Sequence, residues 1–459
     1  MTTIPEFTLP AGFRWGAATA AYQIEGATGE DGRSPSIWDT FARRPGSIFH
    51  GDDATVAIDH YHHWREDLGL LGELGATDYR WSVSWSRIIP EPGRVNPAGL
   101  DFYSRIADTL AEAGIDSMVT LYHWDLPQWA EDAGGWPNRD TAARFREFVD
   151  VVAARLGDRV PRWITINEPY CASFLGHAAG VHAPGIQDEE SALRAAHHLL
   201  LAHGYGTEAL RAAGTGAEVS LAMNVTDVQP ATETDEDATA VRVVDLVENR
   251  LFLDPVLAGR LPEDALEYYR GVTDFAFVRD GDLAAIGADV DFLGVNYYQQ
   301  HDVVADQSRD KFGHGFVRGA GRLPPKPPVS GHGTPIRPDG LYNVLTRVNR
   351  DYDSPPIWVT ENGVALHDYA TPDGRVHDPE RIEYLDAHLR AVARACADGV
   401  PVEGYLVWSL LDNFEWAHGY RVRYGLVYVD LVSQRRIPKD SFEWLRHVIF
   451  HAQGAELVS

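Results

Sequence analysis

Short apolar runs alternate with longer helical patterns along this 459-residue chain, and this alternation restricts the fold more than any other feature. The runs are of strand length, and the segments between them, such as Thr141–Leu156, Ser191–Ala212 and Pro379–Ala397, carry apolar residues at helical spacing. Such an order favours a parallel sheet, because each helix returns the chain to the same sheet edge. The predicted strands are Trp15–Ala20, Ala76–Trp81, Ser117–Tyr122, Arg162–Ile166, Glu218–Met223, Asp291–Asn296, Ile357–Thr360 and Val402–Trp408.

Eight strands with no strong break between the two halves predict a closed (β/α)8 barrel rather than a doubly wound sheet. We expect residues 1–459 to form a single catalytic TIM-barrel domain with extended βα loops, since this fold spans roughly 200 to over 400 residues with insertions. The segment Gln299–Asp339 is rich in Gly, Pro, His and charge, and we expect it to be one such loop.

The net charge and the cysteine content indicate which partners and which cellular compartment to expect. The formal net charge of −27 repels phosphate backbones, so we expect no nucleic-acid partner. No apolar stretch approaches the ~18 residues of a membrane span, and the first residues lack the basic and apolar regions of a secretory signal. Cys171 and Cys396 have no metal or redox spacing and fit a reducing compartment. These features predict a soluble cytoplasmic protein and leave homo-oligomer formation open.

Polar and aromatic residues follow nearly every predicted strand, which is where barrel enzymes carry their chemistry. A single such residue has an ordinary explanation, because a Glu often caps the next helix and a Trp often packs. Together they suit a neutral polyhydroxylated ligand: rings cover the C–H faces of a sugar, and polar edges bind its hydroxyl groups. The strand-end residues include Gln23, Arg80, His123, Trp124, Asn167, Glu168, Glu361 and Trp408.

Two of these residues are carboxylates that can point into the same barrel mouth. Glu168 follows the fourth strand and Glu361 follows the seventh. Glycoside cleavage needs one carboxylic acid to protonate the leaving oxygen and a second carboxylate on the opposite side of the anomeric carbon. Arg80, at a neighbouring rim position, could keep Glu361 ionised, whereas Glu168 would need a less polar setting to stay protonated. The pair is typical of a glycoside hydrolase, whose chemistry needs no metal or organic cofactor, and the sequence alone allows either assignment of the two roles.

Seven motifs, in order along nearly the whole chain, resemble those of glycoside hydrolase family 1, the β-glucosidase family. TINEP (Thr165–Pro169) resembles its acid/base motif and TENG (Thr360–Gly363) its nucleophile motif. TENG alone would be weak evidence, but seven motifs in the family's order argue against coincidence. The other five are FRWGAATAAYQIEG (Phe13–Gly26), YRWSVSWSRIIP (Tyr79–Pro90), LYHWDLP (Leu121–Pro127), WSLLDNFEW (Trp408–Trp416) and YGLVYVD (Tyr424–Asp430).

The resemblance implies a role for each site residue. Glu168 would be the acid/base and Glu361 the nucleophile of a double displacement that retains the anomeric configuration. The residues expected to bind the sugar are Gln23, His123, Trp124, Asn167, Tyr298, Trp408, Glu415 and Trp416, with Arg80, Asn296 and Tyr424 in supporting positions. Tyr298 would hydrogen-bond the nucleophile, and Trp408 would form the stacking floor.

Two variations within the family refine the expected substrate. Its phospho-glycosidases replace the acidic residue at the position of Glu415, so Glu415 favours an unphosphorylated sugar. Its plant thioglucosidases lack the acid/base, so Glu168 favours an O-glycosidase. Two departures concern the pocket edge: Ser330–Leu341 lacks the usual aglycone-site Trp, and Tyr424 replaces a common Phe.

Three alternatives remain at this point. Within the class, a β-galactosidase or β-fucosidase fits the same sugar-binding residues. A non-catalytic sugar-binding barrel would have no reason to keep both glutamates. A metal-dependent barrel hydrolase would need ligands on one face, whereas the histidine groups have poor spacing for this and are expected to be ordinary helix residues. These groups are His60, His62 and His63, and His197, His198 and His203.

Overall fold

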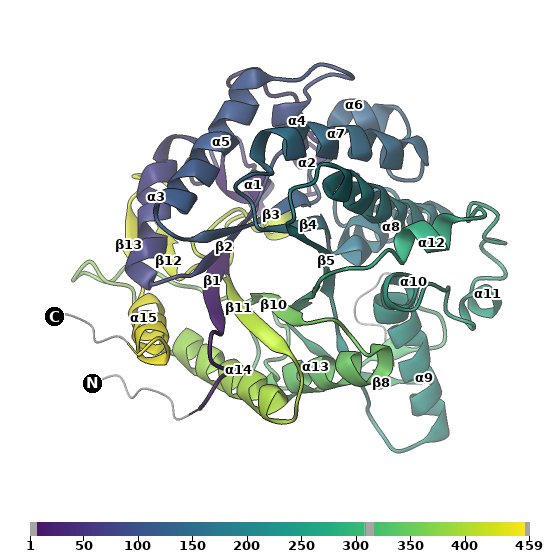
Figure 1. The fold of residues 1–459 in the computed structure, drawn as a ribbon. Helices are drawn as coiled ribbons and strands as arrows, with labels where there is room; N and C mark the ends of the chain where they lie inside the picture. The colour runs from purple at the N-terminus through teal and green to yellow at the C-terminus, as the bar shows by residue number, and fades with distance from the viewer. Residues whose placement is uncertain (1–6, 307, 309–315, 455–459) are drawn as a thin grey trace.

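Eight parallel strands close into a barrel at the centre of the computed structural model, which describes residues 7–306, 308 and 316–454 (Figure 1). Their order around the barrel is β1-β11-β10-β7-β5-β4-β3-β2. All eight strands predicted from the sequence are present, with ends that differ by no more than two residues, so the predicted TIM barrel is confirmed. The strands are β1 (Arg14–Ala18), β2 (Asp78–Ser82), β3 (Asp116–Tyr122), β4 (Arg162–Asn167), β5 (Glu218–Asn224), β7 (Leu293–Tyr297), β10 (Ile357–Asn362) and β11 (Val402–Trp408).

Helices surround the barrel (Figure 1). α14 has the predicted bounds, and α8 begins two residues earlier than predicted because the Asp188 side chain caps it by accepting from the Ser191 amide. No helix within the described ranges is long and apolar enough to cross a membrane. The longer helices are α3 (His60–Leu74), α5 (Pro97–Glu112), α7 (Asp140–Leu156), α8 (Glu189–Ala212), α9 (Asp235–Asp245), α13 (Pro338–Tyr352), α14 (Pro379–Ala397) and α15 (Asp440–Ala452). Shorter helices are α1 (Ala21–Ile24), α2 (Ile37–Ala42), α4 (Trp85–Ile88), α6 (Gln128–Asp132), α10 (Leu251–Leu257), α11 (Ala265–Tyr268) and α12 (Asp282–Ile286), with π-helical turns at Cys171–Ala178 and Leu246–Arg250.

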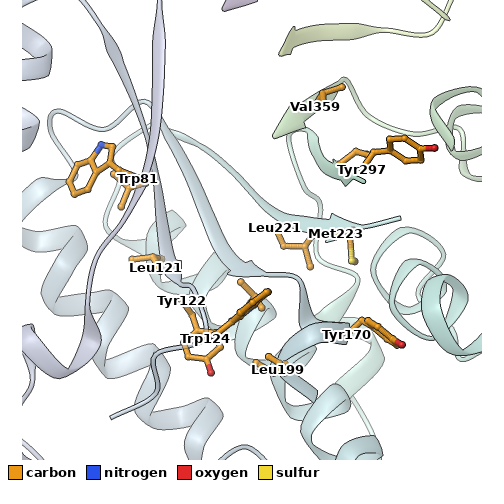
Figure 2. Packing of buried hydrophobic residues seen from close by; sticks show 14 of the residues in the cluster. Trp81, Leu121, Tyr122, Trp124, Tyr170, Leu199, Leu221, Met223, Tyr297 and Val359 are labelled. Carbon is orange, nitrogen blue, oxygen red and sulfur yellow. The ribbon is translucent and has the colours of Figure 1, made fainter. Parts of the chain in front are cut away.

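Two apolar layers stabilise the barrel, one outside its strands and one inside, and neither covers the end where the polar residues lie. One lies between the strands and the surrounding helices, and Figure 2 shows Leu221 and Met223 of β5 in this layer with Leu199 of α8. The other is a smaller cluster of Met118, Ile164, Ala222, Phe292, Trp358 and Leu406. Residues two apart share a strand face, so Ala222 and Leu406 lie on the same faces as Asn224 and Trp408, at the carboxyl ends. The barrel interior is therefore apolar below and polar at its mouth.

The prediction that Gln299–Asp339 is one continuous loop is wrong. It contains β8 (Gln300–Val304) and β9 (Gly321–Arg322), which pair with β6 (Asp227–Pro230) in a three-stranded sheet, and α13 begins at Pro338. Residues 307 and 309–315 of this segment lie outside the described ranges. The pattern of alternate burial in β8 is short, and its first partner, β6, lies far away in the sequence, which hides such a strand from local periodicity. A separate hairpin is formed by β12 (Val427–Val429) and β13 (Arg436–Pro438).

Candidate active site

A cavity of about 520 Å³ opens at the carboxyl ends of the barrel strands. It brings together most of the residues predicted from the sequence, although they come from the ends of five different strands. Gln23, Arg80 and Asn167 are absent from its lining and are fully buried against residues that line it. The predicted residues that line the cavity are His123, Trp124, Glu168, Asn296, Tyr298, Glu361, Trp408, Glu415, Trp416 and Tyr424.

Glu361 lies at the end of β10 between a cation and a hydroxyl group. Its Oε1 accepts from Arg80 Nη1 at 2.5 Å, and its Oε2 accepts from the Tyr298 hydroxyl at 2.7 Å. The register between β10 and β7 shifts between Val359 and Glu361, a bulge of the kind that re-aims a side chain near active sites. Glu361 is 3% exposed, so the guanidinium of Arg80 balances its charge inside the protein.

Glu168 occupies a different environment directly after β4. Its backbone has φ of 46°, in the left-handed region, while its amide donates to the Ala222 carbonyl at 2.8 Å. Its Oε1 accepts from Asn296 Nδ2 at 2.8 Å. Burial and the neighbouring negative charge of Glu361 raise the pKa of Glu168 to about 7. One carboxyl is thus held by a cation and the other is poised to keep its proton near neutral pH.

Asn167 and Asn296 connect the two glutamates. The Asn167 Oδ1 accepts from Arg80 Nη2 at 2.6 Å and from Asn296 Nδ2 at 3.1 Å. The same Asn296 amide donates to Glu168, and the same Arg80 donates to Glu361. Arg80, Asn167 and Asn296 are each no more than 1% exposed, so this network is rigid and shielded from water.

The network also determines the protonation of His123. Because both bonds at the Asn167 Oδ1 come from donors, its Nδ2 must be the end that lies 3.1 Å from His123 Nε2. Burial and the charge of Arg80 hold the pKa of His123 well below its usual range, so the ring is neutral. Nε2 accepts from Asn167, and the proton must therefore be on Nδ1. Within the described residues this Nδ1 has no hydrogen-bond partner, which leaves a buried donor for a ligand.

Gln23 and Glu415 add further polar groups to the site. Gln23 Nε2 donates to Asn413 Oδ1 and to the Phe414 carbonyl, both at 2.9 Å, and lies 3.5 Å from Glu415 Oε2. The Gln23 Oε1 is buried and has no partner within the described residues. Burial in the cavity wall, followed by the charge of Glu361, raises the pKa of Glu415 to about 8. Adjacent donors and acceptors of this kind match the neighbouring hydroxyl groups of a sugar.

Indole rings form the wall around these polar groups. The His123 ring stacks on Trp408 with 18° between the planes and on Trp416 with 13°. The ring centroids of Trp124 and Trp416 lie 4.7 Å apart. The Trp124 indole N–H donates to the Asn167 carbonyl at 2.9 Å. Trp124 and Trp416, like Glu168, have positive φ, which costs about 1–3 kcal/mol each and is typical of functional sites.

Tyr424 lies at the edge of the cavity and contacts the segment without the usual Trp. Its hydroxyl is 3.1 Å from His332 Nε2, and the His332 ring stacks on His418 with 24° between the planes. Burial lowers the pKa of His332 to about 4, so this ring is neutral and the Tyr424 hydroxyl donates to it. The segment without the usual Trp thus contributes a neutral histidine, His332, to this edge of the cavity.

Several cavity residues were missed by the sequence analysis. Asn224, the last residue of β5, is one of them, although it is a polar strand-end residue like those that were predicted. Gln299, two residues after β7, carries the same signal, whereas Glu248 and Arg322 come from a π-helical turn and β9, and no local pattern marks them. Tyr170, Cys171, His182 and His332 also line the cavity.

The histidine groups have structural partners instead. Nitrogen atoms of His60 and His197 lie 2.7 and 2.8 Å from carboxylate oxygens of Asp67 and Asp282, and His203 Nδ1 lies 2.7 Å from the Thr165 hydroxyl. In the described part of the chain no group of three His, Cys, Asp or Glu side chains could hold a metal ion.

Removal of Arg80 provides a test of how the site is held together. Arg80→Met is expected to lower the free energy of unfolding by about 3–5 kcal/mol, because the Glu361 carboxylate is left buried without its cation. Urea denaturation measures the loss. The matched control is Arg155→Met, which removes an exposed pair with Asp101 and is expected to cost less than about 1 kcal/mol. Equal losses in the two variants would contradict this account of the site.

Comparison with known proteins agrees with this geometry. The sequence profile described as glycosyl hydrolase family 1 matches residues 6–454. The chain is 45% identical to β-glucosidase A of Thermotoga maritima over 96% of its length and 97% of the relative. It is 48% identical to a bifunctional β-D-glucosidase/β-D-fucosidase of Bifidobacterium breve over 96% of its length and 98% of the relative. The psychrophilic β-glucosidase of Micrococcus antarcticus superposes with a TM-score of 0.94 at 45% identity, covering 97% of this chain and 98% of that one.

Proposed function

The chain belongs to glycosyl hydrolase family 1, and from this premise we propose that it is a retaining β-glucosidase with Glu361 as nucleophile and Glu168 as acid/base. The observation that carries the proposal is the contrast between the two carboxyl groups in one cavity. Arg80 pairs with Glu361, while burial raises the pKa of Glu168 to about 7. Double displacement needs this division between an ionised nucleophile and a protonated acid.

The proposed reaction has two steps, and Glu168 exchanges a proton in each of them. A carboxylate oxygen of Glu361 attacks the anomeric carbon, the bond to the leaving oxygen breaks, and Glu168 gives its proton to that oxygen. Glu168, now ionised, takes a proton from a water molecule that attacks the glycosyl ester, which restores Glu361 and releases a sugar with retained configuration. Asn296 donates to Glu168 and stabilises the ionised form between the two steps.

The sugar is held by groups whose hydrogen bonds are incomplete in the protein. His123 Nδ1–H offers a donor and Gln23 Oε1 an acceptor, and the Glu415 carboxyl group lines the same cavity. A buried polar atom without a partner costs about 1–3 kcal/mol, which a bound hydroxyl group relieves. Trp408 and Trp416 cover the apolar face of the ring, as at other sugar sites.

The stereochemistry of the first product tests the mechanism. We expect proton NMR of an aryl β-glucoside digest to show the β-anomer of glucose first, followed by mutarotation to the equilibrium mixture. An α-anomer formed first would exclude a covalent glycosyl-enzyme, because a single displacement inverts the configuration.

The pH dependence tests the acid. Glu168 must carry its proton to act on an unactivated leaving group, so kcat/KM for cellobiose is expected to fall as the pH rises through about 7. Asn296 favours the ionised form, so Asn296→Ala is expected to raise the pKa of Glu168 and move this alkaline limb to higher pH. The measurement is kcat/KM against pH, with Asn138→Ala, at a half-buried amide that does not line the cavity, as control. A limb that moves to lower pH in Asn296→Ala would refute the role of this hydrogen bond.

A β-fucosidase activity is a second candidate, favoured by the bifunctional Bifidobacterium breve relative. A fucoside lacks the 6-hydroxyl group, so it cannot form a hydrogen bond from that group to the Glu415 carboxyl group. A panel of kcat/KM values over aryl glucosides, fucosides and galactosides measures the preference.

We further propose that residues 1–459 act as one catalytic domain in the cytoplasm. One large cluster of buried residues runs from Phe13 to Ile449, which supports a single folding unit. Cys171 and Cys396 are both free, which fits a reducing compartment.

A further inference from the structure

A buried row of ion pairs connects the segments that follow β10 and β11, outside the catalytic cavity. Three cations and three carboxylates alternate along it, and the side chain of each is at most 15% exposed. None of the six residues lines the cavity, so none of them touches a substrate there. In the order of their contacts they are Asp378, Arg381, Asp368, Lys439, Asp412 and Arg423.

Lys439 is the central link of this row. Its side chain is fully buried, and its ammonium group donates to Asp368 Oδ2 and, at 2.8 Å, to Asp412 Oδ1. Asp368 follows β10, the strand that carries Glu361, and Asp412 follows the neighbouring strand β11. Lys439 itself directly precedes α15, which packs beside α14 (Figure 1). The C-terminal part of the chain thus joins the loops that follow two adjacent barrel strands.

Asp412 connects this row of ion pairs to a sugar-binding residue. Its Oδ1 also accepts from the Gly425 amide at 3.0 Å. A Cβ atom at position 425 would lie 2.1 Å from the Asp412 amide nitrogen, so only glycine fits this close approach. Backbone hydrogen bonds hold residues 409–412 against residues 424–427. Glu415 is three residues beyond Asp412, so this junction fixes the start of the turn that carries Glu415.

The same turn also orients Gln23. Asn413 Oδ1 accepts from Gln23 Nε2 at 2.9 Å, and Asn413 Nδ2 donates to the Ser409 hydroxyl group at 3.0 Å. Within the described residues no cation pairs with the Glu415 carboxyl group. The position of that carboxyl group therefore follows the position of the turn.

We propose that Lys439 is a positioning residue for sugar recognition: through Asp412 it fixes the turn that presents Glu415 to the substrate. This inference rests on the proposed β-glucosidase function, in which Glu415 binds a sugar hydroxyl group. The carboxylates of Asp368 and Asp412 would repel each other without the ammonium group between them. The charge of Lys439 therefore fixes the spacing between the loop after the nucleophile and the loop that binds the sugar.

The variant Lys439→Met tests this role, because it keeps most of the length of the side chain and removes its charge. Each carboxylate keeps one arginine, at 2.8 Å for Asp368 and at 2.7 Å for Asp412, so the variant is expected to fold. What it loses is the link between the two loops. We expect kcat/KM for nitrophenyl β-glucoside to fall by about three- to tenfold, because the hydrogen bond between the sugar and Glu415 is weakened.

A double-mutant cycle with Glu415→Ala distinguishes positioning from a general structural role. If Lys439 acts through Glu415, Lys439→Met is expected to cost less than about twofold in kcat/KM once residue 415 is already alanine. If Lys439 only stabilises the fold, the two losses multiply. The values are expressed per folded molecule, with the folded fraction taken from circular dichroism.

Asp412→Asn is the second variant. It removes the charge that pairs with Lys439 and keeps an oxygen that can accept from the Gly425 amide. We expect it to show the same loss in kcat/KM as Lys439→Met and the same failure to multiply with Glu415→Ala.

The matched control is Arg139→Met, which also takes one cation from a buried carboxylate. Asp282 is then left with His197 at 2.8 Å, just as Asp412 is left with one partner in Lys439→Met. Neither Arg139 nor Asp282 lines the cavity, so kcat/KM is expected to change by less than about twofold.

The outcomes separate this inference from the function on which it rests. Losses that multiply in both cycles, or unchanged kcat/KM values in Lys439→Met, Asp412→Asn or Glu415→Ala, would overturn the positioning role. Failure of both Lys439→Met and Asp412→Asn to fold, while the control folds, would overturn it too, because the ion pairs would then serve the fold itself. A wild-type protein that hydrolyses no glucoside would instead overturn the proposed function.

Discussion

Replacement of Glu361 by glycine is expected to lower kcat on an aryl β-glucoside by at least about 10⁴-fold, because no other group can form the covalent intermediate. The loss should occur without loss of the fold, which circular dichroism and urea denaturation check. Arg80 keeps its bonds to Asn167 and to the Thr360 carbonyl in this variant, so the cavity wall is retained.

The glycine variant also leaves a space where a small anion can attack. Added azide is expected to restore turnover of an activated aryl glucoside and to give α-glucosyl azide, since it enters from the face that Glu361 occupied. Glu91→Gly, at an exposed carboxylate in a surface turn, is the control and should keep wild-type activity. Near-normal activity of Glu361→Gly would show that the nucleophile has been misassigned.

The second large effect is expected from Glu168→Gln and depends on the leaving group. For cellobiose, whose leaving oxygen needs a proton, kcat/KM should fall by about 10²–10⁴-fold. A dinitrophenyl β-glucoside expels a stable phenolate without a proton, so its kcat/KM, which reports the first step, should change little. The alkaline limb at about pH 7 should disappear, because Glu168 is the group that titrates there.

The dependence on the leaving group is what identifies an acid rather than a general structural role. The control for Glu168→Gln is Glu403→Gln on β11. This variant also loses a carboxylate, but an exposed one, which accepts from the Trp358 indole at 3.1 Å. If Glu168→Gln slowed both substrates by the same factor, Glu168 would not be the proton donor.

The fold and the identity of the two catalytic candidates could be predicted because both depend on local sequence. Strand and helix periodicity repeats within windows of a few residues, so all eight strands and helices such as α14 were placed without any knowledge of tertiary contacts. Glu168 and Glu361 directly follow predicted strands, and the carboxyl ends of barrel strands meet at one mouth. Their proximity therefore followed from topology alone.

Tertiary structure was needed wherever a property depends on contacts between distant segments. The pairing of β6 with β8 and the exposure of Gln299 to two pockets have no local signal, since the partners come from separate parts of the chain. The proton of His123 could be placed only after the donors to Asn167 were known. Likewise, the raised pKa of Glu168 depends on burial and on the charge of Glu361, and the pairing of Glu361 with Arg80 joins segments that are far apart in the sequence. Local periodicity and the residues that follow each strand are thus enough to predict the barrel and the two carboxylates at its mouth. The partners of each carboxylate and the groups that surround the sugar come from distant segments, so only the folded chain brings them together.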